Sequence, residues 1–198
     1  MLTDRVTICG DSGVGKTYIF RLLKGIGLPE FSRSTRIASH FPMKCQLTPE
    51  TTFNINIWDT GGDTKMRDLA EIYLINIDVA IIVFDLSNAQ TVENLNGWIE
   101  TVKNKSPEAE ILIVGNKKDA KSVSDDLISE ATNGHFYIET AASLASDPDS
   151  EDPAAELKDK LVETCKTIKI KQMKPKSTPN SPKKGKKKER KRQTCNIS

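Results

Sequence analysis

A glycine-rich segment near the start of the chain limits the possible folds most strongly. Residues 10–17 read GDSGVGKT and follow an apolar run that predicts a strand over residues 5–9. The sequence KTYIFRLLKG begins within the same segment and predicts a helix that ends at Gly25 or Gly27. Strand, glycine-rich turn and helix in this order predict the first unit of an α/β domain.

The segment has the spacing G-x-x-x-x-G-K-[ST], in the strand-to-helix context that gives the pattern its meaning. Gly13 and Gly15 let backbone N–H groups and the helix N-terminus surround phosphates. Lys16 would bring its charge to the terminal phosphates, and the Thr17 hydroxyl would bind Mg²⁺. A turn used only for packing is the alternative, but every fixed position of the pattern is filled. The other expected phosphate-binding residues of this stretch are Ser12, Val14 and Tyr18.

A second motif, GNKKD at residues 115–119, indicates which base is bound. It follows the buried apolar run ILIV directly. The Asp119 carboxylate can accept two hydrogen bonds from the ring N–H and exocyclic amine of guanine, a pair that adenine does not offer. Lys117 would lie over the base, and Asn116 would tie this loop to the phosphate loop. Taken alone, NKKD would be an ordinary charged surface cluster, but together with the phosphate loop it favours guanine.

The remaining hydrophobic pattern predicts the sheet. Residues 41–47 and 53–57 alternate apolar and polar side chains and predict a hairpin, with Pro42 placing its first strand at an edge. Short, nearly continuous apolar runs predict parallel strands buried on both faces: residues 79–84, 111–114 and 136–138.

Two helical stripes complete the pattern. The first is Val92, Leu95, Trp98, Ile99 and Val102, and the second is Leu157, Leu161, Val162, Cys165 and Ile168. We therefore expect an α/β fold of the P-loop nucleoside triphosphatase class. It would be doubly wound, with a mostly parallel six-stranded sheet and about five helices.

Charge divides the chain into two parts. Residues 166–198 hold 13 lysines and arginines against one acid, whereas the preceding residues hold 16 basic and 26 acidic side chains. We expect a folded domain over residues 1–170 and a disordered basic tail over residues 171–198. The four cysteines form no close pair, which argues against a zinc knuckle or a disulfide framework. The sequence has no long apolar run, so any membrane contact is expected from the tail.

These motifs resemble the small GTPases of the Ras superfamily, and the Rab family most closely. The resemblance spans roughly residues 3–170 and rests on GDSGVGKT, on IWDTGGD at residues 57–63, on GNKKD and on ETAAS at residues 139–143. It implies that Asp59 binds Mg²⁺ through water. It also implies that Ala141 and Ala142 contact the guanine.

The same resemblance implies a molecular switch that binds GTP or GDP with Mg²⁺. Thr35 would ligate Mg²⁺ and sense the γ-phosphate, although the adjacent Ser34 is an alternative, and Gly62 would be a second γ-phosphate donor. We expect a monomer that interacts with an exchange factor, a GTPase-activating protein and effectors, and that acts in vesicle-mediated transport or signalling. The segment after Thr35 reads Arg-Ile-Ala where the family has Ile-Gly, so we expect an effector surface unlike that of a standard Rab.

Asp63 occupies the position at which the family carries the Gln that orients the attacking water. A carboxylate accepts hydrogen bonds but cannot donate one to a phosphate oxygen. It also brings negative charge to a transition state that spreads negative charge over the same oxygens. We therefore expect GTP binding with slow intrinsic hydrolysis. A GTP-bound scaffold with negligible hydrolysis is the alternative, and an Asp63 that only faces solvent is a third possibility.

The tail ends in Cys-Asn-Ile-Ser, which fits a C-a-a-X prenylation site at Cys195. The final Ser favours a farnesyl over a geranylgeranyl group. The basic run at residues 183–192 would supply the second signal that stable attachment to an anionic membrane requires. We expect the protein at the cytoplasmic face of membranes. The same run also fits a nuclear localisation signal, but it has no interleaved aromatic residues, which argues against specific nucleic-acid recognition.

Overall fold

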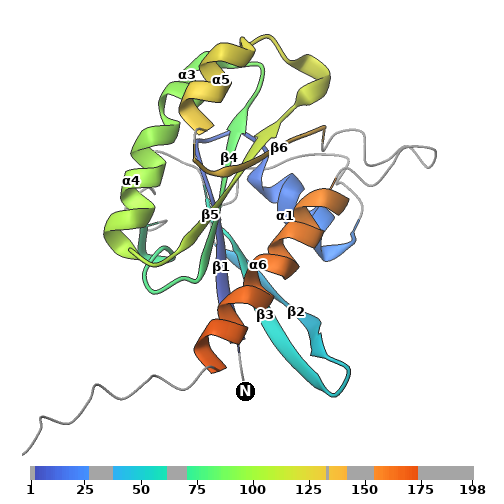
Figure 1. Cartoon of the computed structure of the whole chain (residues 1–198). Helices are drawn as coiled ribbons and strands as arrows, with labels where there is room; N and C mark the ends of the chain where they lie inside the picture. Colours follow the sequence, from blue (N-terminus) through green and yellow to red (C-terminus); the bar gives the residue numbers. More distant parts are fainter. Residues whose placement is uncertain (1–2, 27–37, 62–70, 133, 142–153, 174–198) are drawn as a thin grey trace, which may run out of the picture.

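A six-stranded sheet forms the centre of the domain in the computed structural model (Figure 1), which describes residues 3–26, 38–61, 71–132, 134–141 and 154–173. The strand order is β2-β3-β1-β4-β5-β6. Only β2 and β3 pair in antiparallel register, and the other pairs are parallel. The strands are β1 (Thr3–Cys9), β2 (Ser39–Thr48), β3 (Thr51–Asp59), β4 (Val79–Asp85), β5 (Glu110–Asn116) and β6 (Phe136–Thr140).

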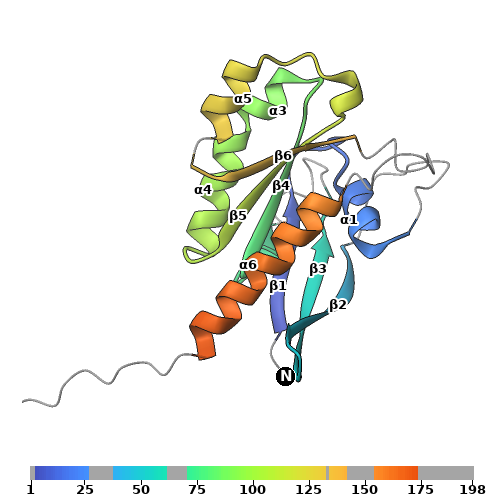
Figure 2. The same ribbon diagram turned by 45° about the vertical axis from the view of Figure 1, so that its right-hand side comes forward.

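Helices cover both faces of this sheet (Figures 1 and 2). On one face lie α1 (Lys16–Lys24) and α6 (Ala155–Met173), and on the other lie α3 (Ala89–Glu93), α4 (Leu95–Lys105) and α5 (Asp125–Thr132). A 3-10 turn, η2 (Lys118–Ala120), follows β5. The predicted doubly wound, mostly parallel six-stranded fold is confirmed.

The sequence pattern also predicted individual elements correctly. α1 ends at Gly25, whose φ of 71° closes the helix in the left-handed conformation. The hairpin forms, and its first strand β2 lies at the sheet edge, where the missing N–H of Pro42 is tolerated. The first helical stripe differs in one respect: Asn94 interrupts it and separates α3 from α4.

Helix α6 contains a feature that the second helical stripe did not predict. Leu157, Leu161 and Cys165 are buried as expected, while Val162 and Ile168 are only partly buried. The buried row continues instead to Lys169, which is 3% exposed. Its Nζ lies 2.5 Å from Oδ1 of Asp4, a fully buried carboxylate in β1. A buried ion pair therefore joins the first strand to the last helix.

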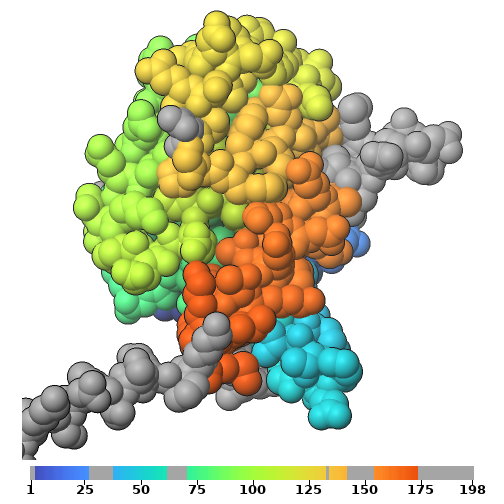
Figure 3. Space-filling view, viewed as in Figure 1, coloured from blue at the N-terminus to red at the C-terminus, as the bar shows by residue number. Residues whose placement is uncertain are grey.

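Helix α6 lies on the surface beside the β2–β3 hairpin (Figure 3) and runs to Met173. It continues past residue 170, the predicted end of the folded domain. Residues 174–198 lie outside the described residues, so the domain boundary stays a prediction. Among the helices of the described part of the chain, none has the length and apolar composition needed to cross a membrane.

Candidate functional site

The phosphate loop lies between β1 and α1, and its glycines permit close backbone contacts. Gly10 has a φ of 136° and Gly15 a φ of 100°, in the region that favours glycine. A Cβ atom on Gly10 would lie 2.1 Å from the carbonyl oxygen of Val83 in β4. A Cβ atom on Gly15 would lie 2.1 Å from Nδ2 of Asn116 in β5. The loop is thus pressed against the carboxyl ends of two parallel strands, where ligands bind in such folds.

Lys16 begins α1 and is held over this loop. Its Nζ donates to the carbonyl oxygens of Gly10 at 3.0 Å and Asp11 at 2.6 Å, and the residue is 6% exposed. Burial lowers the pKa of the Lys16 ammonium, while the nearby carboxylates of Asp59 and Asp11 oppose that shift. A buried ammonium at a helix N-terminus is suited to neutralise an anion.

Thr17 and Asp59 meet at the same end of the sheet. Thr17 Oγ1 donates to Asp59 Oδ2 at 2.8 Å, and Asp59 is 1% exposed. Its other oxygen, Oδ1, is buried without a hydrogen-bond partner among the described residues. Burial raises the pKa of Asp59, although the bond from Thr17 and the charge of Lys16 oppose the shift. An unsatisfied buried oxygen next to a hydroxyl fits a hydrated divalent cation, so these residues fit Mg²⁺.

The predicted guanine loop lies against the phosphate loop. Asn116 is 3% exposed, and its Nδ2 donates to the carbonyl oxygen of Val14 at 2.9 Å. This contact confirms that Asn116 ties the two loops together. Lys117 follows in the left-handed conformation with a φ of 64°, and Asp119 lies exposed in η2.

Two ionic contacts at this loop were not predicted from the sequence. Lys117 Nζ lies 2.5 Å from Oδ2 of Asp85, at the end of β4, and Asp85 also accepts hydrogen bonds from Ser87. Burial would raise the pKa of Asp85, but the bonds from Lys117 and Ser87 lower it. An acid that ends the apolar run VAIIVF was a usable sequence signal, because the carboxyl ends of buried parallel strands form ligand sites.

The second contact joins Lys121 to Glu139, in the stretch that resembles the ETAAS motif. Lys121 Nζ lies 2.5 Å from Glu139 Oε1, and the Tyr137 hydroxyl donates to the same oxygen at 2.9 Å. Lys121 also pairs with Asp125 at 2.6 Å. This network fixes the strand β6 beside the guanine loop. Nothing in the sequence spacing indicated it.

The other predicted site residues are placed as follows. Val14 is fully buried, and Tyr18 packs against the core. Ser12 is exposed, and Ala141 is partly buried. Several predictions lie outside the described residues and are not tested by the structure: Thr35, Gly62, Asp63, Ala142 and Cys195.

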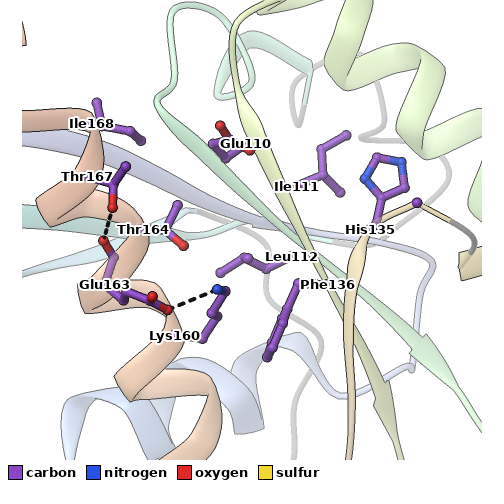
Figure 4. Close-up of a pocket in the computed structure, with 11 residues that line it drawn as sticks. Glu110, Ile111, Leu112, His135, Phe136, Lys160, Glu163, Thr164, Thr167 and Ile168 are labelled. Carbon is purple, nitrogen blue, oxygen red and sulfur yellow. Dashed lines mark hydrogen bonds and ion pairs between the residues drawn. The ribbon is translucent and has the colours of Figure 1, made fainter. Parts of the chain in front are cut away.

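A separate cavity of about 250 Å³ lies between α6 and the amino-terminal ends of β5 and β6 (Figure 4). Ile111, Phe136 and Ile168 form part of its wall, and the Lys160–Glu163 ion pair lies beside it. None of the residues that line it belongs to the predicted nucleotide site, which is assembled from the opposite, carboxyl-terminal strand ends.

Comparison with known proteins agrees with this geometry. The family model described as "Ras of Complex, Roc, domain of DAPkinase" matches residues 5–119, more than half of the chain, and this stretch includes both loops. The chain is 30% identical to the Ras-related protein Rab5 of Nicotiana tabacum over 152 residues, covering 73% of the chain and 75% of that protein. It is 32% identical to the GTP-binding nuclear protein GSP1 of Encephalitozoon cuniculi, covering 73% of the chain and 70% of that protein. It is 28% identical to the GTP-binding protein ypt5 of Schizosaccharomyces pombe, covering 73% of the chain and 72% of that protein.

Proposed function

The chain belongs to the Ras superfamily of small GTPases and is Rab-like, and we propose that it is a membrane-anchored switch, active with GTP and inactive with GDP. The observation that best supports nucleotide binding, on which such a switch depends, is the bond from Asn116 Nδ2 to the Val14 carbonyl oxygen. It joins the base-reading loop to the phosphate loop, as a single nucleotide spanning both loops requires.

Different groups of the site would bind the phosphates and the Mg²⁺ ion. Backbone N–H groups of the loop and the ammonium of Lys16 neutralise the phosphate oxygens. Mg²⁺, when bound, would be held by Thr17 directly and by Asp59 through water, and it would neutralise charge between the terminal phosphates. In the GTP state, Thr35 and Gly62 would contact the γ-phosphate and so order the two switch loops.

Guanine selection is assigned to Asp119, with Lys117 over the base. The test is Asp119→Asn, measured by binding of GDP and xanthosine diphosphate to the full chain. An amide donates one hydrogen bond and accepts another, which matches xanthine instead of guanine. We expect the preference to reverse in favour of xanthosine diphosphate. Unchanged preference for GDP in this variant would contradict the assignment.

Slow intrinsic hydrolysis is proposed from Asp63. A GTPase-activating protein that supplies its own catalytic groups would restore turnover, so the protein would depend on a partner to switch off. The second candidate, a GTP-bound scaffold with negligible hydrolysis, is favoured by the same residue. Turnover with a range of activating proteins separates the two, because a scaffold would remain GTP-bound with all of them.

A role in vesicle-mediated transport is supported by the Rab-like sequence, and the exchange factor, activator and effectors are expected partners. Membrane attachment is proposed through a prenyl group on Cys195 and the basic run at residues 183–192. The test is partitioning of the prenylated chain into vesicles that contain anionic lipid. Cys195→Ser should abolish stable binding, because the basic run alone is screened by salt. Equal partitioning of both proteins would contradict the anchor.

A further inference from the structure

The side chain of Asp11, the second residue of the phosphate loop, is bound by Trp98 of helix α4 and by Asn94, the residue that precedes this helix. Its Oδ1 accepts a hydrogen bond from Trp98 Nε1 at 2.9 Å, and its Oδ2 accepts one from Asn94 Nδ2 at 2.8 Å. Both oxygens of a loop carboxylate are therefore used by donors that lie one helical turn apart. Hydrogen bonds to a charged acceptor are stronger than neutral ones, so this contact restrains the loop firmly.

The two donors are themselves held in place. Trp98 is 6% exposed and packs in the core between α4 and the sheet, which fixes the direction of its indole N–H. The Oδ1 of Asn94 accepts a hydrogen bond from Gln90 Nε2 at 3.3 Å, which leaves Nδ2 directed to Asp11. Trp98 of α4 and Asn94, the residue that precedes this helix, thus offer two donors to the loop carboxylate: a buried indole N–H and an exposed side-chain amide.

The backbone of Asp11 is tied to the residue that meets the phosphates. Its carbonyl oxygen accepts from Lys16 Nζ at 2.6 Å, beside the bond from the same atom to Gly10. The residue is held through its side chain by Asn94 and Trp98 and through its carbonyl by Lys16. A displacement of Asp11 would therefore move an anchor of the Lys16 ammonium.

We propose that Asp11 is a positioning residue, through which Asn94 and Trp98 hold the phosphate loop in its binding shape and so set how long GDP stays bound. The inference rests on the proposed nucleotide-binding function. One charge-assisted hydrogen bond of this kind corresponds to roughly a tenfold change in an equilibrium or rate constant. The loss of one bond should speed GDP release by about that factor, with little effect on the choice of base.

The test exchanges the donor and the acceptor. Asn94→Asp places a carboxylate against that of Asp11 and should speed release of a fluorescent GDP analogue from the full chain about tenfold. The double variant D11N/N94D has the net charge of the parent and again pairs one donor with one acceptor. Its release rate should return to within about threefold of the parent. Asn104→Asp makes the same change at an exposed position of α4 and should release GDP like the parent.

Two further measurements separate positioning from general destabilisation. Trp98→Phe keeps an aromatic ring at this buried position, although a smaller one, and removes the N–H donor without changing the charge; it should also speed release about tenfold. In NMR spectra, Asp11→Asn should move the indole N–H resonance of Trp98 and leave that of Trp58 in place. That signal does not depend on nucleotide, so a parent that fails to bind GDP would refute the proposed function but not the contact. Release from N94D at the parent rate, a double variant no slower than N94D, or an unmoved Trp98 resonance would each overturn the proposal.

Discussion

Loss of one partner of the buried Asp4–Lys169 pair should destabilise the fold severely. Lys169→Met removes the ammonium and leaves the Asp4 carboxylate, which is 0% exposed, without the cation that lies 2.5 Å from it. Breaking a buried pair in this way costs roughly 3–5 kcal/mol. For a domain of this size that is a fall of roughly 6–20 °C in Tm, and a large share of a typical free energy of unfolding.

Replacement of both partners should recover most of this loss. In D4V/K169M the two charges give way to apolar side chains that suit a strand and a helix, and a buried pair exchanged in this manner is often neutral or stabilising. The assay is urea unfolding of the full chain, followed by circular dichroism, for both single variants and the double variant. Lys171→Met, at an exposed position of the same helix, serves as the control and should lie within about 0.5 kcal/mol of the parent.

The pH dependence adds a second check. Burial raises the pKa of Asp4, while the hydrogen bond and charge of Lys169 oppose that shift, so removal of Lys169 should raise this pKa further. A carboxyl with a raised pKa in the folded state contributes stability at low pH and loses it as pH rises through that pKa. The deficit of Lys169→Met should therefore shrink between pH 7 and pH 5. A cost below about 1 kcal/mol, or additive costs of the two single changes, would refute the reasoning.

The remaining predictions concern the site and its supports. Gly15→Ala should abolish nucleotide binding, measured by calorimetry, because its Cβ would lie 2.1 Å from Nδ2 of Asn116. Glu139→Gln should flatten the decline in stability at acid pH, followed by thermal unfolding from pH 6 to pH 3. Burial would raise the pKa of Glu139, but its bonds hold it below the ordinary 4.5, so its contribution is present above pH 4.5 and is lost as pH falls. Ser106→Ala should cost roughly 1–3 kcal/mol in urea unfolding, because a buried backbone N–H loses its acceptor. Thr17→Ala should make GDP release insensitive to a magnesium chelator, whereas chelation should speed release from the parent.

Much of the fold could be predicted because each layer leaves its own pattern. Strands β4 and β5 are buried on both faces, so they read as nearly continuous apolar runs. Strand β2 has one exposed face and one unpaired edge, so it alternates and tolerates Pro42. The two loops were predictable because phosphate and guanine each demand fixed residue types at fixed spacing.

Contacts between distant residues could not be predicted in the same way. Lys169 continues the buried row of α6. From the sequence alone, a lysine at this position is expected on a solvent-exposed face, and only the structure shows that Asp4 lies beside it. The bond from Trp98 to Asp11 joins residues 87 positions apart, and the stripe accounted for Trp98 by packing alone. Pairings of this kind depend on the tertiary fold, which brings the two residues together.

Single-turnover hydrolysis of GTP is the most direct test of the role proposed for Asp63. The full chain and Asp63→Gln are each loaded with GTP, their GTP affinities are compared, and phosphate release is followed without any activating protein. We expect similar affinities and a rate at least about tenfold higher for Asp63→Gln, because the amide restores a donor to the transition state. Equal hydrolysis rates in the two proteins, at the level of an ordinary small GTPase, would contradict that role.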